Sequence, residues 1–200
     1  MTGYCSAARS TIRSAALICL LGAASATSML AGAPAAHAAE PTPIHMQSEV
    51  RQARLAGQGS FRWFGLKIYD AQFWVGDKGY RASAPSAAGF ALDLRYARRL
   101  QGVKIADAAQ EEMLKLNLGS AAQRAAWQTK MTNIFPDVQE GTHLTGVYLP
   151  NQGARFYLDG KLLGEIMDAE FGQAFFAIWL DARTTAPALR SALLADAAPR

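Results

Sequence analysis

The sequence predicts an α+β domain in which an antiparallel β-sheet is covered on one face by helices. Residues 60–75 are dense in aromatic and β-branched side chains, which are typical of strands. Residues 105–134 follow the spacing of helices instead. Residues 142–166 return to strand patterns, ahead of an apolar helix that begins near residue 168. Strands and helices in this order favour an antiparallel sheet with its helices gathered on one face.

The apolar helix near the C-terminus is the element on which the prediction of a covered sheet depends most. Asp168 is suited to cap its first turn, because an aspartate side chain accepts hydrogen bonds from free backbone N–H groups. Apolar side chains then lie on nearly every side of the helix, which predicts that it is buried or lines an apolar cavity. These side chains are Phe171, Ala174, Phe175, Phe176, Ile178, Trp179 and Leu180. A second helix, with leucines on one side, is expected from Pro187.

The first half of the chain is expected to supply the first strands. Residues 39–49 contain two prolines and are expected to be an extended lead-in. Gly57 and Gly59 predict a bend or bulge at the start of the strand region. Residues 60–75 then form either one long bent strand or two strands that meet near Asp70.

The remaining elements follow from alternation and from turn chemistry. After a turn and a loop at 76–89, residues 90–97 alternate between apolar and small or polar side chains, which predicts a half-buried strand. Helices are expected at 105–118 and, after a Ser120 cap, at 120–134. Strands are expected at 142–149, 154–158 and 161–166, where Asp159-Gly160 is a hairpin turn signal.

The N-terminus has the pattern of a secretory signal peptide at residues 1–38. Two arginines precede an apolar run that is too short to span a membrane, and Ala36-His37-Ala38 fits a cleavage site. We therefore expect a periplasmic or secreted protein with one domain at 39–200 and no stable membrane span after cleavage. Both cysteines lie in the signal, so the mature chain is expected to lack disulfides and thiol nucleophiles.

The residues outside the signal contain no pattern of a known catalytic or metal centre. His45 and His143 are far apart in sequence and have no ligand partner at helical spacing, so we expect no metal site and no cofactor. The densest cationic stretch, 95–104, is interpreted as a solvated strand end. Because the other charges are interspersed, nucleic acid is not expected as a partner.

Several arginines and tyrosines on the predicted strands are candidates for ligand binding. An arginine inside an apolar cleft is suited to bind a carboxylate through two parallel hydrogen bonds. The alternative is that these arginines extend to the surface and pair with acids. The residues concerned are Arg51, Arg54, Arg62, Tyr69 and Tyr96.

Residues 55–76 (LAGQGSFRWFGLKIYDAQFWVG) and the D-G-x-x-L-G and F-F-A-I-W-L elements of 158–181 resemble the chalcone isomerase-like family. The resemblance spans residues 50–195. It implies an open-faced β-sandwich, in which a curved antiparallel sheet wraps around a layer of helices and leaves a cleft between them. The family includes plant enzymes that cyclise chalcones, and plastid relatives that hold a fatty-acid carboxylate with an arginine and a tyrosine.

Compared with the isomerases, this chain retains the catalytic pattern only in part. The position at which the isomerases have a small polar residue corresponds to Ile178, whose side chain donates no hydrogen bond. The position of the isomerases' catalytic arginine is nearest to Gln52, which has Arg51 and Arg54 beside it. Asn117 lies in the region of the isomerase asparagine. A non-catalytic role is therefore favoured, because a fatty-acid site needs only a cation, a hydroxyl and an apolar wall.

The leading hypothesis is a non-catalytic periplasmic protein that binds a fatty acid or similar lipophilic carboxylate between sheet and helices. Arg51 or Arg54 would bind the carboxylate, and Tyr69 or Tyr96 would donate a hydrogen bond to it. The apolar wall would come from Phe175, Ile178 and Trp179. The alternatives are an isomerase or intramolecular lyase of the chalcone isomerase type, and a structural or accessory protein with an unknown protein partner.

Overall fold

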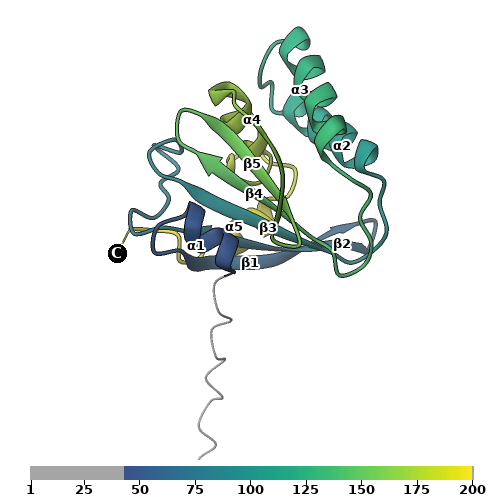
Figure 1. Cartoon of the computed structure of the whole chain (residues 1–200). Coiled ribbons are helices and arrows are strands. Elements are labelled where there is room, and N and C mark those ends of the chain that lie inside the picture. The colour runs from purple at the N-terminus through teal and green to yellow at the C-terminus, as the bar shows by residue number, and fades with distance from the viewer. Residues whose placement is uncertain (1–42, 200) are drawn as a thin grey trace, which may run out of the picture. The chain divides into compact units, whose positions relative to one another are not determined.

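The computed structural model describes residues 43–199, so the predicted signal peptide lies outside the described residues. Six strands form one sheet in chain order, and every neighbouring pair is antiparallel (Figure 1). They are β1 (Arg54–Trp63), β2 (Leu66–Val75), β3 (Phe90–Tyr96), β4 (His143–Leu149), β5 (Gly153–Leu158) and β6 (Lys161–Ile166). The predicted antiparallel sheet is confirmed, and its strands follow the chain order although α2 and α3 lie between β3 and β4.

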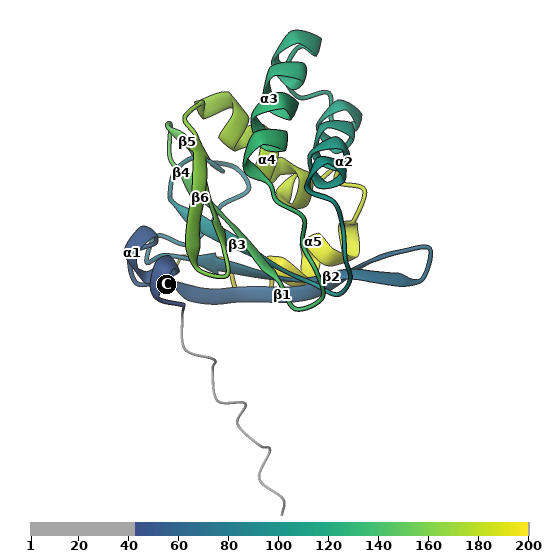
Figure 2. The same cartoon turned by 45° about the vertical axis from the view of Figure 1, so that its right-hand side comes forward.

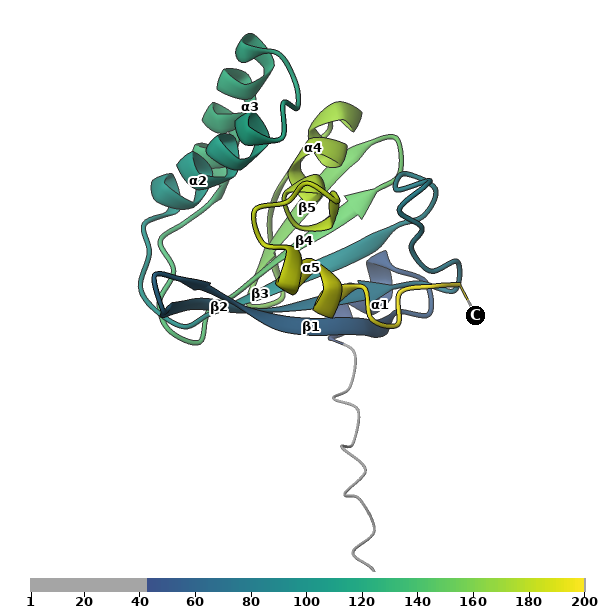
Figure 3. The ribbon, with the colours of Figure 1, turned by 180° about the vertical axis from the view of Figure 1, so that it is seen from behind.

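Four helices cover one face of this sheet, and α4 lies at the centre of the packing. They are α2 (Gly102–Lys115), α3 (Ala121–Ile134), α4 (Ala169–Leu180) and α5 (Pro187–Leu193). Helix α4 packs on β4 and β5, whereas α5 packs on β1, as the view from behind shows (Figure 3). Helices α2 and α3 pair with each other and enclose α4 from its other side. No helix within residues 43–199 is long and apolar enough to cross a membrane.

The predicted burial of α4 is confirmed. Asp168 caps the helix by accepting hydrogen bonds from the backbone N–H groups of Glu170 and Phe171. All seven apolar side chains predicted to surround this helix are less than one-tenth exposed. They form the main core together with the inward side chains of the sheet, such as Phe73, Leu92 and Phe156. Ser120 begins α3 with the expected capping box, in which Gln123 returns a hydrogen bond to the cap backbone.

The outer face of the sheet differs from the prediction of a half-buried strand at residues 90–97. Ala91 and Asp93 are 0% and 3% exposed, although they point away from the main core. A short helix, α1 (Ile44–Glu49), covers this part of the outer face and inserts Met46 into a second apolar cluster. The expectation of an extended lead-in at 39–49 was therefore wrong for residues 44–49. Their prolines precede the helix and do not interrupt it.

The first two strands meet at Phe64-Gly65 and not near Asp70, where one of the two predicted alternatives placed the junction. Trp63 pairs with Leu66 across a two-residue turn, and Asp70 lies in the middle of β2. The predicted irregularity near Gly57 is confirmed, since the strand register shifts between Leu55 and Gly57. At Gly57 an added Cβ would come within 2.1 Å of the Ala192 carbonyl oxygen, so glycine allows α5 to approach β1.

Candidate functional site

The N-terminus of α4 is held by a charged cap and an indole. The Asp168 carboxylate accepts from Glu170 N–H at 3.0 Å and Phe171 N–H at 3.1 Å, and Trp127 Nε1–H donates to its other oxygen at 2.8 Å. Burial acts to raise the pKa of Asp168, but these three donors outweigh it and hold the pKa below its usual value. The cap therefore stays charged and fixes the position of the aromatic side chains on α4.

The C-terminal half of α4 packs near two tyrosines of the sheet, of which Tyr96 is buried and Tyr69 is partly buried. Trp179 Nε1–H donates to the Tyr69 hydroxyl at 3.0 Å, and the Tyr96 ring lies edge-on to Tyr69 with centroids 6.0 Å apart. Burial is the main cause that raises the pKa of both tyrosines, so both phenols remain neutral. Five of the predicted site residues thus belong to one buried group, the tyrosine cluster: Tyr69, Tyr96, Phe175, Ile178 and Trp179.

The tyrosine cluster has an acidic neighbour. After burial and the Trp179 bond, the charge of Glu112 is a further influence on the pKa of Tyr69, and it raises that pKa. The Glu112 carboxylate accepts from Thr185 Oγ1 at 2.7 Å and from Lys115 Nζ at 2.6 Å. None of the five residues of the tyrosine cluster is basic, so the cluster itself offers a ligand carboxylate no cation.

The predicted arginines lie away from the tyrosine cluster. Arg54 binds the C-terminal segment, donating to the Asp196 carbonyl at 2.5 Å and the Ala198 carbonyl at 2.6 Å. It pairs in register with Val75, six residues along β2 from Tyr69, a separation of about 20 Å at the rise of a strand. Arg51 is exposed in the turn before β1. The structure therefore does not bring Arg51 or Arg54 to the tyrosines with which they were expected to act.

An arginine and two other tyrosines meet instead in a cleft on the opposite side of α4, which we call the Arg190 cleft. Its volume is about 270 Å³. Phe90 stacks on Tyr148 with centroids 4.8 Å apart, and Phe176 meets Phe90 edge-on at 5.0 Å, so the wall is largely aromatic. The lining residues are Tyr80, Ala82, Pro85, Phe90, Tyr148, Gly172, Gln173, Phe176, Ala177, Leu180, Asp181, Ala182 and Arg190.

The polar groups of the Arg190 cleft have hydrogen-bonding capacity to spare. Arg190 Nε–H donates to the Leu180 carbonyl at 2.8 Å, which orients the guanidinium, while its two Nη groups form no hydrogen bond within residues 43–199. The Tyr148 hydroxyl is buried, and no group in the described chain forms a hydrogen bond of proper geometry with it. Burial raises the pKa of Tyr148, and the nearby Asn151 backbone N–H partly offsets this rise. Tyr148 is therefore a neutral donor without an acceptor.

The acid that lines this cleft is already paired. Arg183 donates to both oxygens of Asp181, from Nε at 3.0 Å and from Nη2 at 2.9 Å. This pairing is the main cause that holds the pKa of Asp181 below its usual value, and Arg190 lowers it further. With Asp181 neutralised by Arg183, the free Nη groups of Arg190 remain available to an anion.

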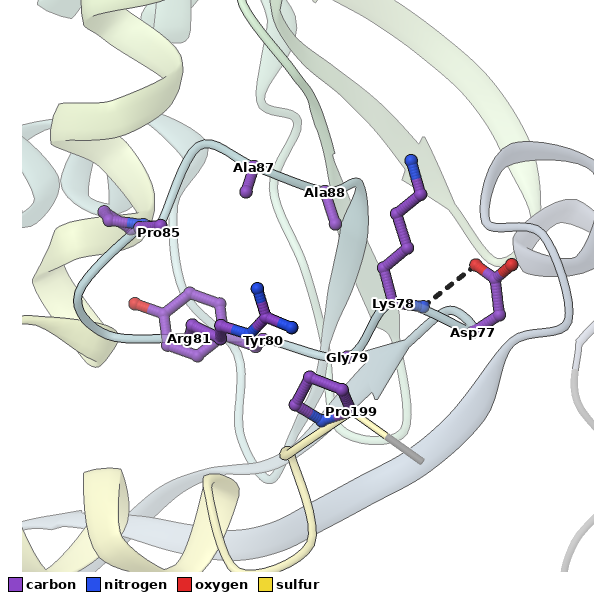
Figure 4. Close-up of a pocket in the computed structure, with 10 residues that line it drawn as sticks. Asp77, Lys78, Gly79, Tyr80, Arg81, Pro85, Ala87, Ala88 and Pro199 are labelled. Atoms are coloured by element: carbon purple, nitrogen blue, oxygen red, sulfur yellow. Dashed lines mark hydrogen bonds between the residues drawn. The ribbon is translucent and has the colours of Figure 1, made fainter.

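A second pocket adjoins the Arg190 cleft, and Tyr80 and Pro85 line both. It has a volume of about 290 Å³ and lies within the loop at 77–88, with Pro199 of the C-terminal segment at its edge (Figure 4). Lys78 N–H donates to the Asp77 carboxylate at 2.9 Å, and Tyr80 N–H donates to the Ala197 carbonyl at 2.7 Å. The C-terminal segment thus fixes the loop that separates the two pockets.

The outer face of the sheet carries a polar network that the sequence analysis did not anticipate. Asp93 accepts from Thr145 Oγ1 and pairs with His143 Nδ1, both at 2.7 Å, and His45 Nε2 lies 3.1 Å from Thr145 Oγ1. The two histidines, far apart in sequence, therefore join one network. Within residues 43–199, no group of three or more potential ligand side chains is arranged to hold a metal ion.

Comparisons with known proteins agree with this architecture. Residues 38–195 match the model of the chalcone isomerase-like family. An uncharacterized protein of Haemophilus influenzae is 33% identical over 105 residues, and the match spans 52% of this chain and 50% of that protein. This chain therefore spans half the length of the curated relative that it matches.

A solved structure shares the fold at low sequence identity. It is the crystal structure of an Arabidopsis thaliana fatty-acid binding protein, which has a TM-score of 0.59 and 12% identity to this chain. The superposition covers 74% of this chain and 89% of that protein. At this identity the likeness shows the fold alone, a curved antiparallel sheet packed against helices. Together with the match over residues 38–195, it shows that the chain belongs to the chalcone isomerase-like family and has the chalcone isomerase fold.

Proposed function

We propose that this protein binds a lipophilic carboxylate, of the fatty-acid type, in the Arg190 cleft and does not transform it. The observation that carries the proposal is a largely aromatic cleft lined by Arg190, whose Nη groups are free, and by Tyr148, whose buried hydroxyl has no acceptor. A buried donor without a partner costs free energy, and a ligand oxygen removes that cost. The fatty-acid binding relative in Arabidopsis adds support at the level of the fold.

The dimensions of the cleft favour a short or medium chain. Its volume of about 270 Å³ lies near the lower end of small-molecule pockets, which begin at about 300 Å³. Arg190 would hold the carboxylate, Tyr148 or Tyr80 would donate to it, and the alkyl chain would lie against Phe90 and Phe176. A medium-chain acid such as decanoate is therefore a suitable first ligand.

The chemistry of the cleft supports binding without catalysis. Its one carboxylate, Asp181, is held in an ion pair with Arg183, and its tyrosines are buried and neutral. General base catalysis needs a group whose pKa lies near the working pH. The described lining offers no such group, which favours a carrier or sensor over an isomerase.

Calorimetric titration with decanoate tests the proposal. We expect binding that Arg190→Gln weakens about tenfold or more, because a charge-assisted pair is lost, and that Tyr148→Phe weakens less. Arg95→Gln is the matched control, since this arginine is exposed on β3 and does not line the cleft. Decanol is the matched ligand control, as it keeps the chain but lacks the charge.

The same titration also tests the residues proposed from sequence. If Arg51→Gln or Arg54→Gln abolishes decanoate binding while Arg190→Gln does not, the carboxylate binds at the earlier predicted residues and the cleft assignment fails. Retained binding with Tyr69→Phe is expected. Equal affinity for decanol and decanoate in the wild type would contradict carboxylate recognition altogether.

The proposal places this activity outside the cytoplasm, on the basis of the signal pattern at residues 1–38. Protein recovered from the periplasm of an expressing bacterium should begin at Ala39 by intact mass. Native mass spectrometry of the same material should show a bound acid that denaturation releases. A chain that keeps residues 1–38 in the cytoplasm would contradict the proposed location.

A further inference from the structure

The tip of the β1–β2 hairpin exposes three large apolar side chains within four residues. Trp63, Phe64 and Leu66 are 64%, 89% and 56% exposed, and the Trp63 and Phe64 rings contact each other with centroids 5.2 Å apart. Figure 2 shows this hairpin extending past the ends of the other strands. Soluble domains rarely gather large apolar groups at one exposed point, so this tip indicates a contact surface.

The backbone conformation of the turn is one that an aromatic residue rarely adopts. Phe64 and Gly65 have φ values of 45° and 80°, so both central residues of the turn are left-handed. Such turns favour Asn-Gly or Asp-Gly, and a bulky side chain at positive φ is strained. Folding alone favours another residue at position 64. The phenylalanine therefore points to a role that does not serve stability.

Cations flank the apolar tip on both strands of the hairpin. Arg62 Nη1–H donates to the Gly65 carbonyl at 3.1 Å, which keeps its guanidinium beside the turn. Lys67 follows on the other strand and pairs with Asp70 at 2.6 Å. The net charge of the hairpin end is positive, because Asp70 is the single acid between residues 60 and 70.

Two further arginines leave the sheet at the same end. Ala97 N–H donates to the Ile68 carbonyl at 2.9 Å, so the chain that follows β3 runs beside the base of the hairpin tip. Arg98 and Arg99 come next and are exposed. They belong to the densest cationic stretch of the sequence, which therefore lies beside the base of the apolar tip.

We propose that this hairpin tip docks the protein on the surface of a membrane that contains anionic lipids. Tryptophan and other aromatic side chains favour the headgroup layer, where one part of the ring is wet and the other is apolar. Arginine and lysine beside them are attracted to lipid phosphates. An apolar tip surrounded by cations is complementary to a layer of anionic headgroups above acyl chains. Trp63, Phe64 and Leu66 would enter this layer. The four cations, Arg62, Lys67, Arg98 and Arg99, would remain at its surface.

Docking of this kind is peripheral and reversible. The apolar tip comprises only three side chains, which reach about 5–10 Å into the boundary layer in interfacial segments of this type. The cationic part of the attraction falls with salt, since exposed charges are screened over about 10 Å at 0.1 M ionic strength. The inference rests on the hairpin tip and the two arginines beside it, and it stands whether or not the Arg190 cleft binds a carboxylate.

Cosedimentation with lipid vesicles tests the proposal with the full mature chain. The vesicles are phosphatidylethanolamine with roughly one quarter phosphatidylglycerol, a typical anionic surface, against pure phosphatidylcholine. We expect the wild type to sediment with the anionic vesicles and to be released by salt. Combined substitution of Trp63, Phe64 and Leu66 by serine should abolish sedimentation. Arg98→Glu with Arg99→Glu should weaken binding by about tenfold or more, since each lost cation removes about fivefold.

Leu162→Ser is the matched control, because Leu162 is a comparable apolar side chain, 59% exposed, on the distant strand β6. It should bind vesicles as the wild type does. Circular dichroism confirms that each variant is folded, which is expected since the tip side chains contact mainly solvent. A wild type that stays in the supernatant, or a serine variant that sediments as well as Leu162→Ser, would overturn the proposal.

Discussion

Phe64 is the residue whose conformation is least explained by folding. Its φ of 45° places a bulky side chain in the left-handed region, which costs about 1–2 kcal/mol relative to a residue suited to that region. We predict that Phe64→Asn raises the free energy of unfolding by about 1 kcal/mol and weakens vesicle binding at the same time. Urea unfolding measures the first effect and cosedimentation the second.

Gly65→Ala provides the opposite case at the same turn. Its φ of 80° also lies in the left-handed region, and an added Cβ would meet no atom within 4 Å. Only backbone strain changes, so we expect a loss of stability with vesicle binding retained. If Phe64→Asn destabilises the protein, then the aromatic side chain supports the fold and the argument from strain is wrong.

His143 links stability to pH through a buried carboxylate. The hydrogen bond that the His143 ring donates to Asp93 is the main cause that raises the pKa of His143 above its usual value, and burial partly opposes it. The folded state therefore holds a proton that the unfolded chain releases near pH 6.5. This stabilisation is complete below about pH 6.5 and is lost as the pH rises through the higher folded pKa. Among its other neighbours, Arg95 lowers the pKa of His143 and Asp159 raises it, and the charge of His143 in turn lowers the pKa of His45.

We predict that His143→Gln is less stable than the wild type at about pH 5.5 by up to about 1 kcal/mol, after allowance for solvent screening. The difference should shrink as the pH rises. His45 acts in the other direction, because burial lowers its pKa and its protonation opposes folding at low pH. Thermal unfolding of His143→Gln and of the wild type across this range measures the effect. A difference for His143→Gln that grows with pH would contradict the assigned coupling.

At the scale of elements, the cap of α4 holds more than one helix. The Asp168 carboxylate completes the first turn of α4 and also accepts from Trp127 of α3. Asp168→Ala removes a cap worth about 0.5–2 kcal/mol and leaves the buried indole N–H without a partner at about 1–3 kcal/mol. We therefore predict a loss of about 2–4 kcal/mol in denaturant unfolding. Glu170→Ala, at an exposed position two residues after Asp168, should cost less than about 0.5 kcal/mol. Equal losses in the two variants would show that the shared carboxylate is not the cause.

Elements with local signals were predictable from the sequence, and those that depend on distant packing were not. Ser120 and Asp168 predicted where their helices begin, because a capping side chain contacts only the first turn of its own helix. The turn at Phe64-Gly65 was missed because phenylalanine is not a turn residue. Helix α1 was missed because six residues do not form a stable helix alone, and this one is held by burial of Met46 against the sheet.

The same distinction applies to the candidate site. The tyrosine cluster was predictable, since Tyr69 and Tyr96 alternate inward on strands and Trp179 lies on an apolar helix. The Arg190 cleft was not, because it combines a loop, two strands and two helices that no sequence spacing relates. Arg190 gave a weak signal as a charged residue in an otherwise apolar helical segment. Arg54 was expected to bind a ligand, but it holds the C-terminal segment, whose position depends on the complete fold.

On the scale of the whole molecule, ligand binding should link elements that the chain separates widely. The Arg190 cleft joins the 77–89 loop, β3, β4, α4 and α5, so an occupant that binds only the folded state stabilises all of them together.

We predict that decanoate at one hundred times its dissociation constant adds about 2.7 kcal/mol to the free energy of unfolding. For a domain of this size the midpoint of thermal unfolding should rise by about 5–10 °C, measured by differential scanning fluorimetry. Arg190→Gln should lose most of this shift, whereas Arg95→Gln and Tyr69→Phe should keep it. A shift that disappears with Tyr69→Phe and persists with Arg190→Gln would move the ligand to the tyrosine cluster.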